Sequence, residues 1–306
     1  MSSTIDHTMG ARDWMLLVSL SLLWGGSFFL IELAITGLPP LTIVLLRVSL
    51  AAAALWIYAG LRGLNPPRKP GAWRAFLTMG CLNNVAPFVL IVWGQTHITS
   101  GLASILNATA PLFTIIVAGL LLADERITLA KTLGVLAGFS GVVLMMGPAA
   151  LRGVGSELLA QCAILLAAFC YACAGVFGRR FQRMGVDPVV TAAGQVTASS
   201  LVLAPLAIGF DQPWLLPLPS ILVIAAIVIL ALLSTALAYI LYFRLLATAG
   251  ATNLLLVTFL IPISAILLGT LLLGESLSGE HYLGMGLIGL GLVAIDGRAV
   301  KRLVKR

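Results

Sequence analysis

The chain has 306 residues, of which 60% are hydrophobic and only 9% are charged. Soluble domains carry roughly 25% charged residues, so this composition excludes a protein whose whole surface faces water and indicates a polytopic membrane protein. The formal net charge is +7. The basic residues stand in short loops between apolar runs, which is typical of orientation signals facing the cytoplasm and does not indicate a nucleic-acid partner.

Ten apolar segments are long enough to cross a lipid bilayer, which takes about 20 mostly apolar residues in a helix. They cover residues 14–36, 41–60, 74–94, 101–122, 127–147, 157–178, 188–209, 219–243, 250–273 and 281–297. The first is too long for the apolar core of a secretory signal, so we expect it to be retained as a span. The sequence therefore predicts an all-α polytopic membrane protein with ten transmembrane helices.

The basic residues predict the orientation of these helices. With the N-terminus placed inside, only Arg152 of the 18 Lys and Arg residues falls in an outer loop, and Arg47 lies within a helix. The other sixteen fall in inner loops and tails, which is a strong positive-inside bias. We therefore expect a multi-pass protein of the cell (inner) membrane with both termini in the cytoplasm.

The second half of the chain repeats the first. In each half an apolar segment with a proline ends in an acidic residue, and a glycine-rich segment follows. The matching pairs are Glu125 and Glu275, Gly134 and Gly284, and Gly141 and Gly291, each 150 positions apart, and Pro111 and Pro262, 151 apart. A repeat of half the chain predicts two similar units, at residues 1–149 and 150–306.

Each unit would contain five helices, an odd number, so the second unit would cross the membrane upside down relative to the first. Secondary transporters use this inverted-repeat plan, with the binding site between the repeats near the middle of the bilayer. The repeat also pairs Arg47, seven positions after Pro40, with Gln195, seven positions after Pro188.

This arrangement resembles the EamA-type transporters of the drug/metabolite transporter superfamily. The resemblance covers the whole chain and is carried by the ordered, duplicated motif above, by Trp24–Phe28 (W-G-G-S-F) and by the L-R-V-S-L segment around Arg47. It implies two inverted five-helix repeats and the transport of a small-molecule substrate. Within this superfamily, the resemblance indicates exporters of amino acids and similar metabolites.

Polar residues inside a bilayer are costly unless they are paired or hydrated, so they mark candidate pathways. Six of them lie near the middle of an apolar run or beside its proline, and we predict that they bind substrate: Trp24, Asn83, Asn107, Tyr171, Tyr239 and Thr258. Each could instead bond its own helix backbone, join two helices or pack in the core. Pro111 and Pro262 free a backbone carbonyl one turn earlier and are candidate hinges, or they produce static kinks.

Three further expectations concern architecture. Glu32 and Arg47 should lie at similar depth and form a salt bridge, and Glu125 and Glu275 should cap the helices that follow them. The glycine-rich segments favour close helix packing, either within one chain or across a homodimer. Cys170 and Cys173 form a C-x-x-C pattern without a second pair or a His cluster, so we interpret them as packing residues and expect no metal or cofactor.

The leading functional hypothesis is a secondary transporter that exports small organic metabolites, most plausibly amino acids, by alternating access. Efflux of drugs or toxic cations is the alternative, although it usually requires an acidic residue deep in the cavity. An intramembrane enzyme would need a catalytic Ser/Lys pair, paired Asp residues or a metal cluster at membrane depth, and the sequence offers none. A membrane protein without a substrate is less consistent with the repeated prolines and mid-span polar residues.

Overall fold

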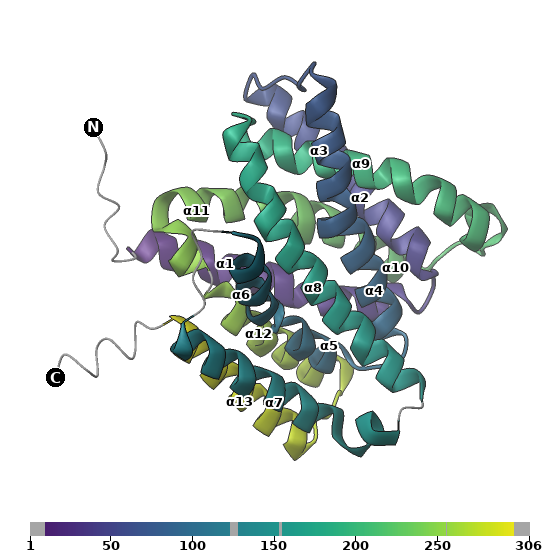
Figure 1. Cartoon of the computed structure of the whole chain (residues 1–306). Helices are drawn as coiled ribbons and strands as arrows, with labels where there is room; N and C mark the ends of the chain where they lie inside the picture. Colours follow the sequence, from purple (N-terminus) through teal and green to yellow (C-terminus); the bar gives the residue numbers. More distant parts are fainter. Residues whose placement is uncertain (1–9, 123–127, 153–154, 255, 297–306) are drawn as a thin grey trace.

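The structure, a computed structural model, describes residues 10–122, 128–152, 155–254 and 256–296, and these parts are helical with no strand among them (Figure 1). Seven helical stretches are long and apolar enough to cross a membrane: Ala11–Ala34, Pro40–Leu61, Pro70–Gln95, Ser100–Leu121, Ser156–Arg183, Pro188–Asp211 and Ile221–Ala249. Two shorter apolar stretches, Lys131–Leu144 and Leu260–Leu273, accompany them. The protein is therefore a polytopic α-helical membrane protein, as the sequence predicts.

Several spans consist of more than one helical element. The first half contains α1 (Ala11–Ala34), α2 (Pro40–Leu61), α3 (Pro70–Gly80), η1 (Cys81–Val85), α4 (Ala86–Gln95), α5 (Ser100–Asn107), α6 (Ala110–Leu121) and α7 (Leu129–Arg152). The second half contains α8 (Ser156–Arg183), α9 (Pro188–Leu206), η2 (Ala207–Asp211), η3 (Pro213–Leu215), α10 (Ile221–Ala231), η4 (Leu232–Leu237), α11 (Ala238–Leu254), α12 (Val257–Leu273) and α13 (Gly279–Asp296).

The helix starts follow from local sequence. Pro40, Pro70 and Pro188 each occupy the first position of a helix, where the missing proline N–H costs no hydrogen bond. The side chain of Asp187 accepts a hydrogen bond from the backbone N–H of Val189 at 2.7 Å. Such caps satisfy N–H groups that have no partner within the helix, so these boundaries are fixed by the sequence itself.

Several predicted segment ends differ from the helix ends, and the largest difference lies between the eighth and ninth segments. The sequence places residues 250–254 at the start of the ninth segment, but these residues continue α11, which ends at Leu254, and α12 begins only at Val257. The preceding helix carries on because no proline stands there to interrupt it, and Gly250 is tolerated inside a helix at a modest cost.

The glycine-rich helices α7 and α13 pack against each other within the chain, and Figure 1 shows them side by side at one edge of the bundle. A Cβ atom added to Gly141 would lie 2.5 Å from the backbone oxygen of Gly284, and one added to Gly291 would collide with that of Gly134. The two contacts are reciprocal: each joins a glycine to the repeat counterpart of the other. Interfaces with two-fold symmetry have this property, so the glycines serve packing within one chain.

Acidic side chains cap helices across the bundle rather than along the chain. Both carboxylate oxygens of Glu275 accept hydrogen bonds from α5, from the N–H of Ser100 at 2.9 Å and from that of Gly101 at 3.0 Å. The prediction that Glu275 caps the helix after it is therefore wrong. Gly274, at φ +67°, ends α12 in the left-handed region and turns the chain there. Glu125 lies outside the described residues.

Two more contacts join distant connections. Asp211 accepts from the N–H and the hydroxyl of Thr42, at 2.7 and 2.9 Å, near the start of α2. The hydroxyl of Thr248 donates to Asp13 at 2.8 Å. The ten-span topology puts the partners of each contact, including Ser100 with Glu275, on the same side of the membrane.

Candidate functional site

Buried and partly buried polar side chains from five spans meet between the helices. We call this group the central polar cluster and define it by the following residues: Arg47 on α2, Asn83 and Asn84 on η1, Tyr171 on α8, Gln195 on α9, Thr235 on η4 and Tyr239 on α11. Arg47, Asn84, Gln195 and Thr235 are each at most 5% exposed. Such burial of polar groups inside an apolar bundle is expected mainly at functional sites.

Two π-helical segments supply part of the cluster. η1 carries both asparagines and η4 carries Thr235, and each interrupts its span near the middle. Pro87 follows η1 by two residues and cannot donate a hydrogen bond to the carbonyl of Asn83. The N–H of Ala86 instead bonds the carbonyl of Cys81, five residues earlier. Single π turns inside α-helices occur frequently at functional sites.

Tyr239 organises the amide side of the cluster. Its hydroxyl oxygen accepts hydrogen bonds from the side-chain nitrogens of Asn83, at 3.0 Å, and Asn84, at 2.9 Å. Asn83 also donates to the side-chain oxygen of Gln195 at 3.3 Å. The widened π turn therefore brings both neighbouring asparagines onto one oxygen. The amide oxygen of Asn84 is buried without a hydrogen-bond partner.

Arg47 occupies the other side of the cluster. Its Nε donates to the hydroxyl of Thr235 at 2.9 Å, and its guanidinium carbon lies 3.8 Å from the ring centroid of Phe88. Thr235 in turn donates to the carbonyl of Leu230 at 2.8 Å. The planar guanidinium thus stacks on an aromatic face, an arrangement that is attractive in a desolvated setting.

The predicted salt bridge between Glu32 and Arg47 is absent. Glu32 instead accepts a hydrogen bond from Gln95 at 3.3 Å, and Gln95 also donates to the carbonyl of Phe28 at 2.8 Å. Glu32 and Arg47 each form hydrogen bonds with residues of other helices, Gln95 and Thr235, and not with each other. Within the described part of the chain no carboxylate pairs with Arg47.

The structure brings together three of the six predicted substrate-binding residues. Asn83 and Tyr239 are hydrogen-bonded, and Tyr171 and Tyr239 are both close enough to Arg47 to interact electrostatically. Trp24 lies beside this group, because its ring centroid is 5.7 Å from that of Tyr242, three residues after Tyr239 on α11. These residues come from both halves of the chain.

The remaining predicted residues lie at helix breaks. Asn107 is the last residue of α5, and its buried amide oxygen has no hydrogen-bond partner. Pro111 is the second residue of α6, just beyond the break. Thr258 is the second residue of α12, and Pro262 lies inside that helix. A role for Asn107 and Thr258 in binding, and hinge motion at either proline, stay predictions.

The six predicted substrate-binding residues do not include four members of the cluster, Arg47, Asn84, Gln195 and Thr235. The repeat contained a usable signal for two of them, because Arg47 and Gln195 stand at equivalent positions, seven residues after the proline that begins each helix. A polar residue at the same place in both halves of an inverted repeat is expected near the shared axis. Thr235 had no such signal.

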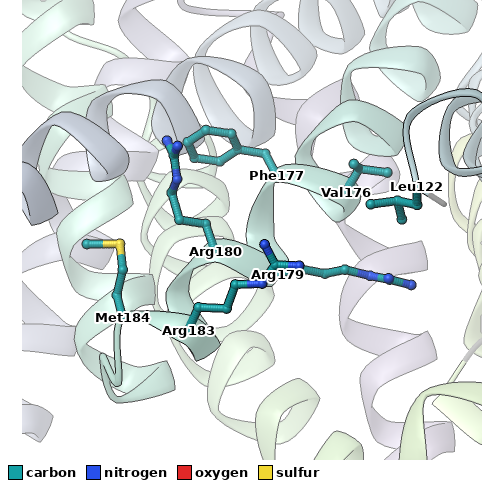
Figure 2. A pocket seen from close by; sticks show the side chains of 7 residues that line it. All are labelled: Leu122, Val176, Phe177, Arg179, Arg180, Arg183 and Met184. Atoms are coloured by element: carbon teal, nitrogen blue, oxygen red, sulfur yellow. The ribbon is translucent and has the colours of Figure 1, made fainter. Parts of the chain in front are cut away.

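A separate hollow of about 420 Å³ lies at the end of α8 and is lined by Leu122, Val176, Phe177, Arg179, Arg180, Arg183 and Met184. Figure 2 shows Arg180 against the ring of Phe177, with Arg179 and Arg183 reaching away from it; the Arg180 guanidinium carbon is 5.2 Å from the ring centroid. The basic residues that line this hollow agree with the predicted cytoplasmic position of the end of α8. It shares no residue with the central polar cluster, although Val176 follows Tyr171 by five residues on α8.

A polytopic helical bundle with a buried polar cluster between spans from both halves is the architecture of a membrane transporter. Residues 13–147 and 158–295 each match the EamA-like transporter family. The chain belongs to that family.

Similar proteins carry transporter names. The chain is 23% identical over 257 residues to the uncharacterized transporter YoaV of Bacillus subtilis (strain 168), covering 83% of this chain and 86% of that protein. It is 26% identical over 256 residues to the uncharacterized inner membrane transporter YedA of Escherichia coli (strain K12), covering 83% and 80%.

Two other similar proteins support less: one matches only part of the chain, and the other shows only the fold. A probable terminal-alkyne amino-acid exporter of Streptantibioticus cattleyicolor is 33% identical over 122 residues, which cover 40% of each chain. A solved crystal structure superposes with a TM-score of 0.69 at 21% identity, covering 97% of this chain and all of that one. The latter likeness shows the fold alone.

Proposed function

We propose that the protein exports small organic metabolites, with amino acids as the leading substrate class, across the inner membrane by alternating access. The observation that carries this proposal is the central polar cluster, which combines hydrogen-bonding amides and phenols with a buried cation between spans of both halves. Inverted repeats place binding sites at this kind of interface. The name of the Streptantibioticus relative, an amino-acid exporter, supports the substrate class.

The chemistry of the cluster argues against toxic cations as the main substrates. Cavities that bind cationic drugs usually carry a carboxylate, whereas the charged member of the cluster, as far as the structure describes it, is Arg47. Glu32, an acidic residue within the first span, accepts a hydrogen bond from Gln95 close to the end of α1. A cluster with a buried arginine and no carboxylate among its described residues suits a zwitterionic substrate better than a cationic drug.

The two halves, residues 1–149 and 150–306, would rock against each other about the cluster. The breaks before Pro111 and Val257 are places where a small backbone rotation would move whole helices. We also propose that both termini face the cytoplasm, since that orientation leaves a single basic residue in the outer loops.

Counterflow with purified protein in liposomes tests the proposal. Vesicles preloaded with unlabelled amino acid should accumulate the same radiolabelled amino acid transiently, while empty liposomes should not. The panel should hold amino acids, nucleosides and cationic dyes. Accumulation of dyes without any amino acid would contradict the substrate class and favour drug efflux.

A further inference from the structure

The central polar cluster contains a buried cation whose charge is not balanced by a carboxylate. Arg47 is 5% exposed, and a charged side chain inside a transmembrane bundle is costly unless it is paired or hydrated. Its Nε is occupied by Thr235 and one face by Phe88. Its two terminal amino groups find no acceptor in the described part of the chain, so a guanidinium fork remains available.

A second hydrogen-bond donor stands beside it. Tyr239 uses its hydroxyl oxygen to accept from both Asn83 and Asn84, which occupies the two lone pairs of a phenol. Its proton must therefore be donated elsewhere, and the described residues provide no acceptor. The hydroxyl of Tyr171, also within electrostatic reach of Arg47, likewise makes no hydrogen bond to them.

The cluster also holds one buried acceptor without a partner, the amide oxygen of Asn84, on a side chain that is 0% exposed. A buried polar atom left unpaired is destabilising, so each such atom in a native structure calls for an explanation. Here an unpaired acceptor and a set of unpaired donors belong to one cluster, in which Asn84 contacts Tyr239.

We infer that Arg47 and Tyr239 bind the carboxylate of a zwitterionic amino-acid substrate, with the amide oxygen of Asn84 accepting from its ammonium group. This inference rests on the proposed function and specifies how its site recognises the substrate. A guanidinium and a carboxylate pair through two parallel hydrogen bonds. One buried positive charge matches one carboxylate, whereas a phosphate ester would bring a charge of about −2 that the site does not balance.

The inference separates ligands by functional group in the unmodified protein. Counterflow of radiolabelled L-phenylalanine is measured in the presence of four unlabelled competitors: L-phenylalanine, L-phenylalaninamide, phenethylamine and 3-phenylpropionate. L-Leucine and L-leucinamide form a second series of competitors. The amide and the amine lack the carboxylate and should compete at least tenfold more weakly than the amino acid. Equal competition by phenethylamine would overturn the inference.

Variants of Tyr239 and Arg47 test whether these two residues recognise the carboxylate. Tyr239→Phe keeps the ring and should weaken amino-acid competition about fivefold while leaving the weak competition by phenethylamine unchanged. Arg47→Lys keeps the charge but loses the fork, and Arg47→Gln loses both, so the loss should grow in that order. Matched controls are Tyr58→Phe and Arg62→Gln, since Arg62 donates to the Tyr58 hydroxyl at 3.0 Å in an exposed pair.

The outcomes distinguish failure of the carboxylate site from failure of the proposed amino-acid export. A uniform loss for all ligands in Tyr239→Phe would mean that the residue only holds the helices together, and this inference would fail while the export of amino acids stood. If Arg47 variants do not fold, the competition series and Tyr239→Phe still decide. If no amino acid exchanges in the unmodified protein while dyes or nucleosides do, the proposed substrate class falls, and the carboxylate site with it.

Discussion

Arg47 on α2 and Thr235 on η4 are joined by a 2.9 Å hydrogen bond between spans that belong to different halves of the chain. The threonine hydroxyl both accepts from Arg47 and donates to the carbonyl of Leu230. The π-helical turn of η4 is thereby connected to the orientation of the guanidinium.

Replacing Thr235 should therefore disturb Arg47. Thr235→Val removes the hydroxyl at nearly constant volume and leaves the buried Nε unpaired, so we expect a loss of about 1–2 kcal/mol in unfolding free energy and weaker transport. Thermal unfolding in detergent measures the first effect and counterflow the second. Thr235→Ser should retain most of both. Thr78→Val, at an exposed hydroxyl that bonds only its own helix, is the control, and an equal effect there would contradict the prediction.

Alanine at the predicted substrate-binding residues should lower transport more than stability. Loss of one hydrogen bond to a ligand costs about 1 kcal/mol, or roughly fivefold in apparent affinity. Concentration dependence of counterflow, read beside thermal unfolding, tests each variant; Arg74→Ala, at an exposed position, is the control. Activity that declines only in step with stability would identify the residue as packing. The variants are made at Trp24, Asn83, Asn107, Tyr171, Tyr239 and Thr258.

The close approach of α7 and α13 predicts a sharp contrast between glycines. Gly141→Ala would place a Cβ atom 2.5 Å from the oxygen of Gly284, whereas at Gly286 an added Cβ meets nothing within 4 Å. Overpacking of this kind typically costs 1–3 kcal/mol. Thermal unfolding should therefore show a lower midpoint for Gly141→Ala and little change for Gly286→Ala. Similar midpoints for the two variants would show that α7 and α13 do not pack in this way.

Glu275 should matter for stability through α5. Glu275→Gln keeps one acceptor oxygen but removes the other and the negative charge at a helix N-terminus, so we expect a loss of about 1–2 kcal/mol. Glu280→Gln changes an exposed acidic residue in the first turn of α13 and is the control. Chemical or thermal unfolding of the two variants decides, and an unperturbed Glu275→Gln protein would refute the cross-bundle cap.

The orientation proposal can be tested by labelling. In a variant without Cys81, Cys162, Cys170 and Cys173, single cysteines placed in 37–40, 148–156 or 211–217 should react with a membrane-impermeant thiol reagent added to intact cells. Cysteines in 64–70 or 180–186 should react only after the membrane is permeabilised. The reverse pattern would overturn the cytoplasmic placement of the termini.

The sequence by itself determined the class of fold. Apolar length specifies spans because a bilayer accepts only segments whose backbone groups are bonded internally, and local residues such as Pro40, Pro188 and Asp187 fix helix starts through backbone geometry. It also singled out Asn83, Tyr171 and Tyr239, which the structure brings into the central polar cluster, because polar side chains at mid-span depth are expensive unless they meet one another.

Only the tertiary structure decided which polar groups meet. Depth along a helix follows from residue number, but the direction that a side chain faces depends on how each helix is rotated and packed, and π turns such as η1 and η4 shift that rotation within a span. Arg47 therefore reached Thr235 and Phe88 rather than Glu32, and Glu275 capped α5 rather than α13. These contacts cross more than a hundred residues of sequence, where local patterns carry no information about rotation.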